Sequence, residues 1–127
     1  YKLRFLKAPL PRWPADESIL LALRHLSEGH QSAYRLHFGA IASGDEDVID
    51  RNRAEELFQE TGALCVDWEG AGAARVAAFN KLRFLEIRVI TDGADADAAV
   101  TFPQNLKTVM PHIRSLLVSL RGGSPKT

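Results

Sequence analysis

ALCVDWEGAGAARVA, residues 63–77, is the stretch of sequence that decides the fold. Its first part, residues 63–66, is a short apolar run that predicts a buried strand. Residues 69–79 follow as a predicted helix, one face of which consists almost wholly of glycine and alanine. Because small side chains let a helix lie close against a sheet, this stretch predicts an α/β arrangement.

Two helices and a strand are predicted on the N-terminal side of this stretch. Asp16 offers an N-cap, and apolar residues at helical spacing follow it as far as Gly29. Residues 34–43 have strand character. Residues 50–61 carry a short amphipathic pattern that Gly62 closes, which predicts a second helix.

On the C-terminal side, residues 82–90 predict another strand, residues 92–99 a loop and residues 102–120 a final helix. Pro103 suits the first turn of that helix, and Pro111 is expected to kink or split it. The alternation of helices and strands predicts an α/β, layered helix–sheet–helix domain with a largely parallel or mixed sheet.

The composition narrows the class of protein. The 127 residues suffice for one hydrophobic core, so we expect residues 1–127 to form a single domain with a flexible tail at 122–127. Sixteen basic and sixteen acidic residues cancel, which argues against nucleic acid and anionic membrane as partners. No apolar run approaches the roughly 20 residues that span a bilayer. The single Cys65 excludes an internal disulfide and favours a cytoplasmic protein.

Carboxylates stand at the ends of all the predicted strands, within residues 43–45, 67–69 and 91–92. In open α/β sheets, ligands bind outside the carboxyl ends of the strands. Two acids there suit cleavage of a glycosidic bond, in which one protonates the leaving group and the other binds the sugar. The acid must stay protonated near neutral pH, which requires partial burial or a nearby like charge.

Simpler interpretations of the same residues remain open. Glu69 is also an acid at a helix N-terminus, where the helix dipole favours it, and Asp92 could cap the next turn. The acidic residues of 45–50 favour a solvated loop over a metal site. The four histidines share no ligand-like spacing, so no metal is expected; they are His25, His30, His37 and His112.

Three segments together carry a family resemblance. GAIASGD at 39–45 resembles the G-x-I-A-S-G-D segment of the purine nucleoside phosphorylase / methylthioadenosine–S-adenosylhomocysteine nucleosidase superfamily. Residues 63–77 resemble its A-x-x-V-[DE]-M-E-[GA]-A-[AG]-x-A segment, and FLEIRVITDGAD at 84–95 its F-x-x-[IV]-R-x-[IV]-S-D-x-A-D segment. The match covers the C-terminal half of that fold. It implies a nucleoside phosphorylase-like chain that is incomplete at its N-terminus, with the missing N-terminal half of the same protein as a partner.

The resemblance assigns roles to individual residues. Glu69 would bind the ribose 2′- and 3′-hydroxyls, and Asp92 would deliver a proton to N7 of the purine. Arg88 would be an ion-pair partner that organises the site. The remaining substrate-binding set comprises Trp68, which replaces a family methionine, Thr91, Val48, Phe102 and Ser43.

The function implied is cleavage of the N-glycosidic bond of a purine nucleoside, with a 5′-methylthioadenosine/S-adenosylhomocysteine-type nucleosidase favoured. The alternatives are a phosphorylase that takes phosphate as co-substrate and a non-catalytic nucleoside-binding relative. Trp68 and Asp47, which replaces a family aromatic, favour the binding protein, whereas Glu69 and Asp92 argue for a catalyst. No cofactor is expected, and the family resemblance favours a homo-oligomer, preferably a dimer.

Overall fold

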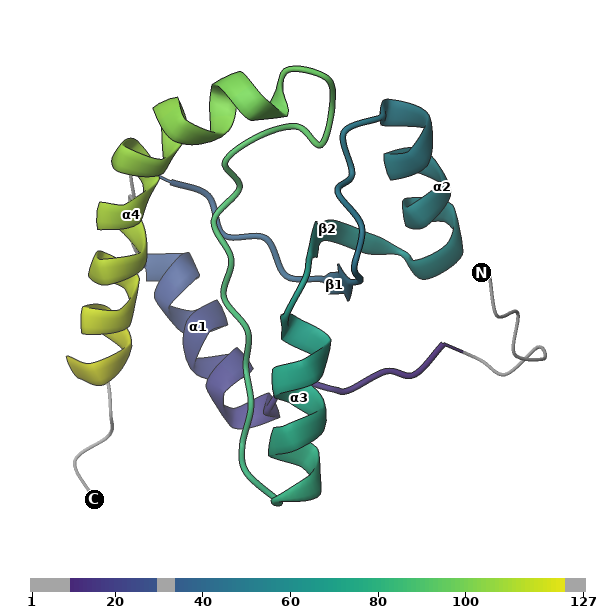
Figure 1. The fold of residues 1–127 in the computed structure, drawn as a ribbon. Helices are drawn as coiled ribbons and strands as arrows, with labels where there is room; N and C mark the ends of the chain where they lie inside the picture. Colours follow the sequence, from purple (N-terminus) through teal and green to yellow (C-terminus); the bar gives the residue numbers. More distant parts are fainter. Residues whose placement is uncertain (1–9, 30–33, 123–127) are drawn as a thin grey trace.

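The structure is a computed structural model that describes residues 10–29 and 34–122. It alternates helices and strands around a small parallel sheet, so the chain is an α/β protein (Figure 1). In chain order the elements are α1 (Glu17–Gly29), β1 (Ala40–Ser43), α2 (Arg51–Thr61), β2 (Ala63–Asp67), α3 (Gly70–Phe79) and α4 (Ala98–Gly122). Gly122, expected in the tail, is the last residue of α4, and residues 123–127 lie outside the described part.

Local signals set the ends of the first two helices, and the Asp16 cap and the Gly62 stop are as predicted. The Asp16 carboxylate accepts a hydrogen bond of 3.0 Å from the Ile19 amide, which caps the N-terminus of α1. Asp50 caps α2 by accepting from the amides of Asn52 at 2.7 Å and Arg53 at 3.3 Å. Gly62 ends α2 at a φ of 69°, a left-handed conformation that glycine adopts without strain.

The sheet consists of β1 and β2, which pair in parallel from Ala40 opposite Ala63 to Ser43 opposite Asp67. The Gly44 amide donates to the Asp67 carbonyl at 3.0 Å, so the pairing continues just beyond the strand ends. The prediction that β2 is buried was wrong in part, since Leu64 is 55% exposed and Val66 36% exposed. Alternate residues of a strand face opposite sides of a sheet, and only one side of β2 is covered here.

The predicted strand at 82–90 is absent, which corrects the sequence-based expectation. The segment runs extended alongside α3, and the Phe84 carbonyl accepts from the Asp16 amide at 2.6 Å near the start of α1 (Figure 1). Strand propensity reflects how side chains pack on a sheet, and it does not itself supply a partner strand. The sequence therefore predicted that this segment is extended, but it did not show that no neighbouring strand among the described residues pairs with it.

Helix α4 also differs from its prediction. It begins at Ala98 rather than at Phe102, so Pro103 lies beyond the first turn and Pro111 in the interior. Figure 1 shows that α4 bends between its green first turns and its yellow last turns, and it is not split. A proline inside a helix removes a hydrogen bond and pushes away the preceding turn, which accounts for the bend.

The described core is small and is made mostly of short side chains. Leu23 of α1 and Leu116 of α4 are each 5% exposed where these two helices pack together. Ala74 and Ala77 of α3 are buried, as expected for the glycine–alanine face of this helix. Across residues 10–29 and 34–122, no helix has the length and apolar character needed to cross a membrane.

Candidate active site

The end of β2 and the start of α3 are joined by side-chain caps. The Gly70 amide donates to Asp67 Oδ2 at 3.1 Å, and the Ala71 amide donates to Ser43 Oγ at 2.8 Å. These two bonds use N–H groups at the N-terminus of α3 that have no partner within the helix. Ser43, expected to bind substrate, therefore holds α3 against the end of β1.

Arg88 joins three carboxylates at this strand end. Its Nη2 donates to Glu69 Oε2 at 3.0 Å and also contacts Asp67 Oδ2, while its Nε donates to Glu86 Oε1 at 2.6 Å. The Asp67 side chain is 5% exposed and the Glu86 side chain 18%, whereas that of Glu69 is 67% exposed. Arg88 thus connects two carboxyl groups that are largely shielded from solvent to one that faces it.

Burial and neighbouring charges shift the acid–base behaviour of this cluster. Burial, together with the proximity of Asp67, raises the pKa of Glu86 above its ordinary value. Burial opposes ionisation of Asp67, but the adjoining side chains of Glu86 and Ser43 and the charge of Arg88 hold its pKa below the ordinary value. Burial also raises the pKa of the Cys65 thiol, with help from Asp67 and Glu86, which fits an unreactive cysteine.

Asp92 belongs to a second hydrogen-bonded group. Its Oδ2 accepts from Thr91 Oγ1 at 2.8 Å, and its Oδ1 accepts from the Ala94 amide at 3.0 Å. The second bond is the turn contact that the simpler interpretation of Asp92 expected. Asn105 of α4 donates to the Thr91 carbonyl at 2.7 Å, so α4 fixes the start of this loop.

The other predicted substrate-binding residues come from several elements. Trp68 is 59% exposed, and its Nε1 donates to the Glu46 carbonyl at 3.3 Å, which ties the end of β2 to the loop after β1. Val48 is half-buried in that loop, and Phe102 is 47% exposed on α4. No hydrogen bond within the described residues joins Glu69 to Asp92. The binding roles of these side chains stay predictions.

Sequence reasoning assigned no role to Asp67 or Glu86, although both lie in the cluster around Arg88. A signal for Glu86 existed, because residues two apart in an extended segment point to the same side, and Glu86 precedes Arg88 by two. Nothing in the sequence showed that Gly70 leaves the space that Glu86 fills. A Cβ at position 70 would collide with the Glu86 carboxyl group.

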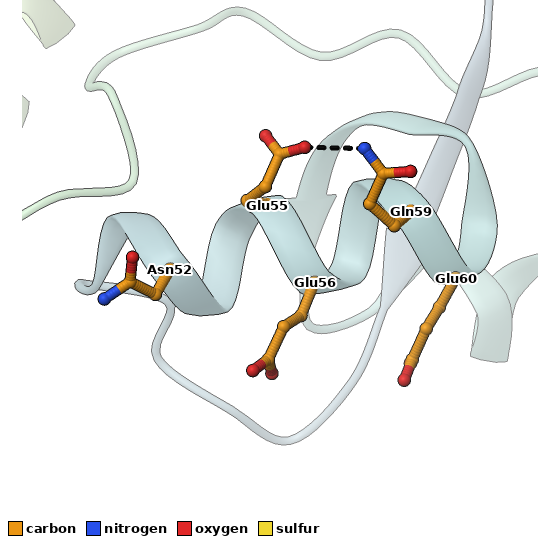
Figure 2. Close-up of a pocket in the computed structure, with 5 residues that line it drawn as sticks. All are labelled: Asn52, Glu55, Glu56, Gln59 and Glu60. Carbon is orange, nitrogen blue, oxygen red and sulfur yellow. Dashed lines mark hydrogen bonds between the residues drawn. The ribbon is translucent and has the colours of Figure 1, made fainter.

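Two further features of the described residues lie outside this candidate site. No group of three His, Cys, Asp or Glu side chains there is arranged to hold a metal ion. A surface depression runs along α2, and Figure 2 shows its lining side chains projecting from that single helix, with Gln59 donating to Glu55 at 2.6 Å. The lining residues are polar or acidic, as expected for a solvated face; they are Asn52, Glu55, Glu56, Gln59 and Glu60.

The fold and this site define an α/β protein with a polar, carboxylate-rich site at the carboxyl edge of a parallel sheet. Comparison with known proteins makes the class specific. Residues 3–120 match the profile of the family described as the Phosphorylase superfamily, and the chain belongs to that superfamily.

Similar proteins are named as nucleosidases or hydrolases. The 5′-methylthioadenosine/S-adenosylhomocysteine nucleosidase of Thermotoga maritima is 37% identical over 93 residues, which is 71% of this chain and 43% of that protein. That of Geobacillus thermodenitrificans is 32% identical over 113 residues, 86% of this chain and 46% of the relative. The chain therefore spans about half the length of the curated relatives it matches.

Solved structures show the same likeness in three dimensions. The futalosine hydrolase of Helicobacter pylori superposes with a TM-score of 0.81 at 27% identity, covering 92% of this chain and 50% of that one. A 5′-methylthioadenosine/S-adenosylhomocysteine nucleosidase of the same organism, solved in complex with a substituted pyrrolidin-3-ol, gives 0.81 at 26% identity with the same coverage. The nucleoside phosphorylase-like fold expected from the sequence is confirmed.

Proposed function

We propose that the protein containing this chain cleaves the N-glycosidic bond of a purine nucleoside, as a nucleosidase of the 5′-methylthioadenosine/S-adenosylhomocysteine type. The observation that carries the proposal is the placement of Glu69. Its carboxylate extends into solvent just after β2 and accepts a hydrogen bond from Arg88. The names of the similar nucleosidases support the substrate class.

The chemistry assigns different tasks to the two acids. Cleavage of the C–N bond passes through a transition state in which the ribose gains positive charge, and water then adds to C1′ and gives up a proton. An ionised Glu69 binds the ribose hydroxyls and stabilises that charge. Asp92 transfers a proton to N7 of the departing base, and Thr91 Oγ1, which donates to its Oδ2, orients the carboxyl group. Neither step uses a cofactor or metal.

The test is base release by the full-length protein. Purified protein is incubated with 5′-methylthioadenosine, S-adenosylhomocysteine, adenosine, inosine or guanosine, and free base is quantified. We expect Asp92→Asn to lower kcat by about 10²–10⁴-fold, the usual contribution of a general acid. Asp97→Asn is the matched control, because Asp97 is an exposed aspartate of the same loop. Equal loss in both variants would exclude the assigned role of Asp92.

Phosphate distinguishes the alternatives. The same assay is run with and without it, and release only in its presence identifies a phosphorylase with phosphate as co-substrate. If no base is released but nucleoside binds, the protein is a non-catalytic relative. The exposed indole of Trp68 beside Glu69 favours that second outcome over the phosphorylase, because a large apolar ring there suits stacking.

We further propose that an N-terminal half of the same protein completes the fold, and that the whole protein is a cytoplasmic homo-oligomer, preferably a dimer. Coverage of about half of each relative supports the first part. Exposed apolar side chains support additional covering surfaces, among them Leu64, Val76, Phe79 and Leu82, at 55%, 60%, 87% and 65% exposure. The single Cys65 supports a reducing compartment.

A further inference from the structure

Arg88 and the carboxyl groups of Asp67, Glu69 and Glu86 form a cluster at the end of β2. One carboxylate oxygen of this cluster has no hydrogen-bond partner in the described structure. Asp67 Oδ2 accepts from the Gly70 amide and contacts Arg88, but Asp67 Oδ1 is buried and unpaired. The side chain as a whole is 5% exposed. A buried carboxylate oxygen without a donor is costly, so a donor is expected at this position.

Two groups beside Asp67 carry a proton that can be donated to it, the Ser43 hydroxyl and the carboxyl of Glu86. Arg88 contacts both carboxyl groups, Glu86 through Nε and Asp67 through Nη2, so these two side chains lie side by side. The placement of Glu86 is constrained, because it occupies the space left by the absent Cβ of Gly70 and accepts from Arg88 Nε at 2.6 Å. Two ionised carboxylates in such contact repel, whereas a protonated carboxyl is a strong donor to a carboxylate.

We propose that Glu86 is a positioning residue, which keeps its proton at a pH where an ordinary glutamate has lost it and donates that proton in a hydrogen bond to Asp67 Oδ1. The neutral carboxyl satisfies Asp67 and fixes the guanidinium of Arg88 through Nε. Nη2 of Arg88 then remains aligned on Glu69, at 3.0 Å. The claim that Glu86 assists ribose binding rests on the proposed function of Glu69. The claim that Glu86 and Asp67 share a proton is independent of that function.

The surrounding charges agree with one shared proton. The groups around Glu86 are Asp67 and Cys65 from β2 and Arg88 from its own segment, and Arg88 in turn contacts Glu69 at the start of α3. If Asp67, Glu69 and Glu86 were all ionised, the single positive charge of Arg88 would stand against three negative charges. A proton on Glu86 halves the net charge of the cluster, from two negative charges to one.

The proposal gives a definite pH dependence. The pKa of Glu86 is raised by burial and by Asp67, so its stabilising contribution is present at low pH and is lost as pH rises through that raised pKa. The pKa of Asp67 is lowered, so its contribution is lost as pH falls through the lowered pKa. The cluster is therefore most stable between these two pKa values.

The direct experiment is a carboxyl NMR titration of the full-length protein, in which Glu86→Gln identifies the Glu86 resonance. We expect Glu86 to titrate above the ordinary glutamate range. Titration at or below that range would overturn the proposal. No nucleoside is involved, so this failure is distinguishable from a failure of the proposed function.

The Glu86→Gln variant supplies an independent measurement. Its amide imitates the protonated carboxyl, with Nε2 donating to Asp67 and Oε1 accepting from Arg88. As pH rises through the raised pKa of Glu86, we expect the wild type to lose thermal stability relative to this variant. Glu60→Gln, on the exposed side of α2, controls for removal of a negative charge. The same pH dependence in wild type and Glu86→Gln would contradict a protonated Glu86.

The positioning role has its own readout in nucleoside cleavage. Glu86→Ala removes the donor to Asp67 and the acceptor for Arg88, so we expect KM to rise about tenfold, the equivalent of one buried hydrogen bond. Glu86→Gln is expected to restore KM. An unchanged KM in Glu86→Ala overturns the link to Glu69. If that variant does not fold, the titration and the glutamine variant still decide the proposal.

Discussion

Asp50 shows how one residue fixes an element boundary in this chain. It accepts hydrogen bonds from the amides of Asn52 and Arg53 at the start of α2. Because an N-cap side chain satisfies donors that the helix leaves unpaired, we expect Asp50→Ala to lower the free energy of unfolding by about 1 kcal/mol. Denaturant unfolding measures the change.

The matched control for this substitution is Asp45→Ala in the preceding loop, where the side chain is exposed. It should alter stability by less than about 0.5 kcal/mol, as surface substitutions usually do. An equal effect of the two variants would show that α2 does not depend on its cap.

The role of a residue was easier to predict when its partner lies close to it along the chain. The caps Asp16 and Asp50 and the left-handed Gly62 were predictable, because their partners lie within a few positions along the chain. The contact of Glu86 with Gly70 joins two segments whose separation in space no sequence pattern reveals. Glu69 and Asp92 were selected through the family resemblance, since acidic residues at strand ends are common.

At the scale of elements, the pairing of α1 with α4 provides most of the buried leucine. Leu116 is 5% exposed, whereas its neighbour Leu117 is 49% exposed. We expect Leu116→Ala to lower the free energy of unfolding by about 2–4 kcal/mol through lost burial and an unfilled cavity. Leu117→Ala, the same chemical change on the outer side of α4, should cost under about 1 kcal/mol.

Thermal or denaturant unfolding of both variants checks this expectation. Similar losses at positions 116 and 117 would mean that α4 does not pack on α1 through the side that contains Leu116. The comparison is informative because the two leucines share one helix and have the same helix propensity.

Elements were predicted best where local patterns suffice. Helices α1, α2 and α3 match their predictions to within about a residue at each end. The start of α4 was missed because a proline was assumed to lie in the first turn, whereas Pro103 lies further inside. The strand at 82–90 was predicted from its side chains, but a strand also needs a neighbour, which the described residues do not provide.

For the whole molecule, the extended segment 82–90 provides a test of the proposed N-terminal half. If that half adds a strand there, the backbone amides of 85–89 become hydrogen-bonded and exchange slowly with deuterium in the full-length protein. The amides of Gly93, Asp95 and Ala96 serve as an internal reference, because they lie in the loop before α4 and should exchange faster. Fast exchange in both segments would exclude strand addition at this site.

Gly70 gives the chain a position at which one methyl group would rearrange a charged cluster. Alanine here would strike the Glu86 carboxyl. That carboxyl is the far end of a flexible side chain, so it would swing aside and would not bar the substitution. The effect of the exchange would therefore fall on the contact that Glu86 makes with Arg88, with little cost in space.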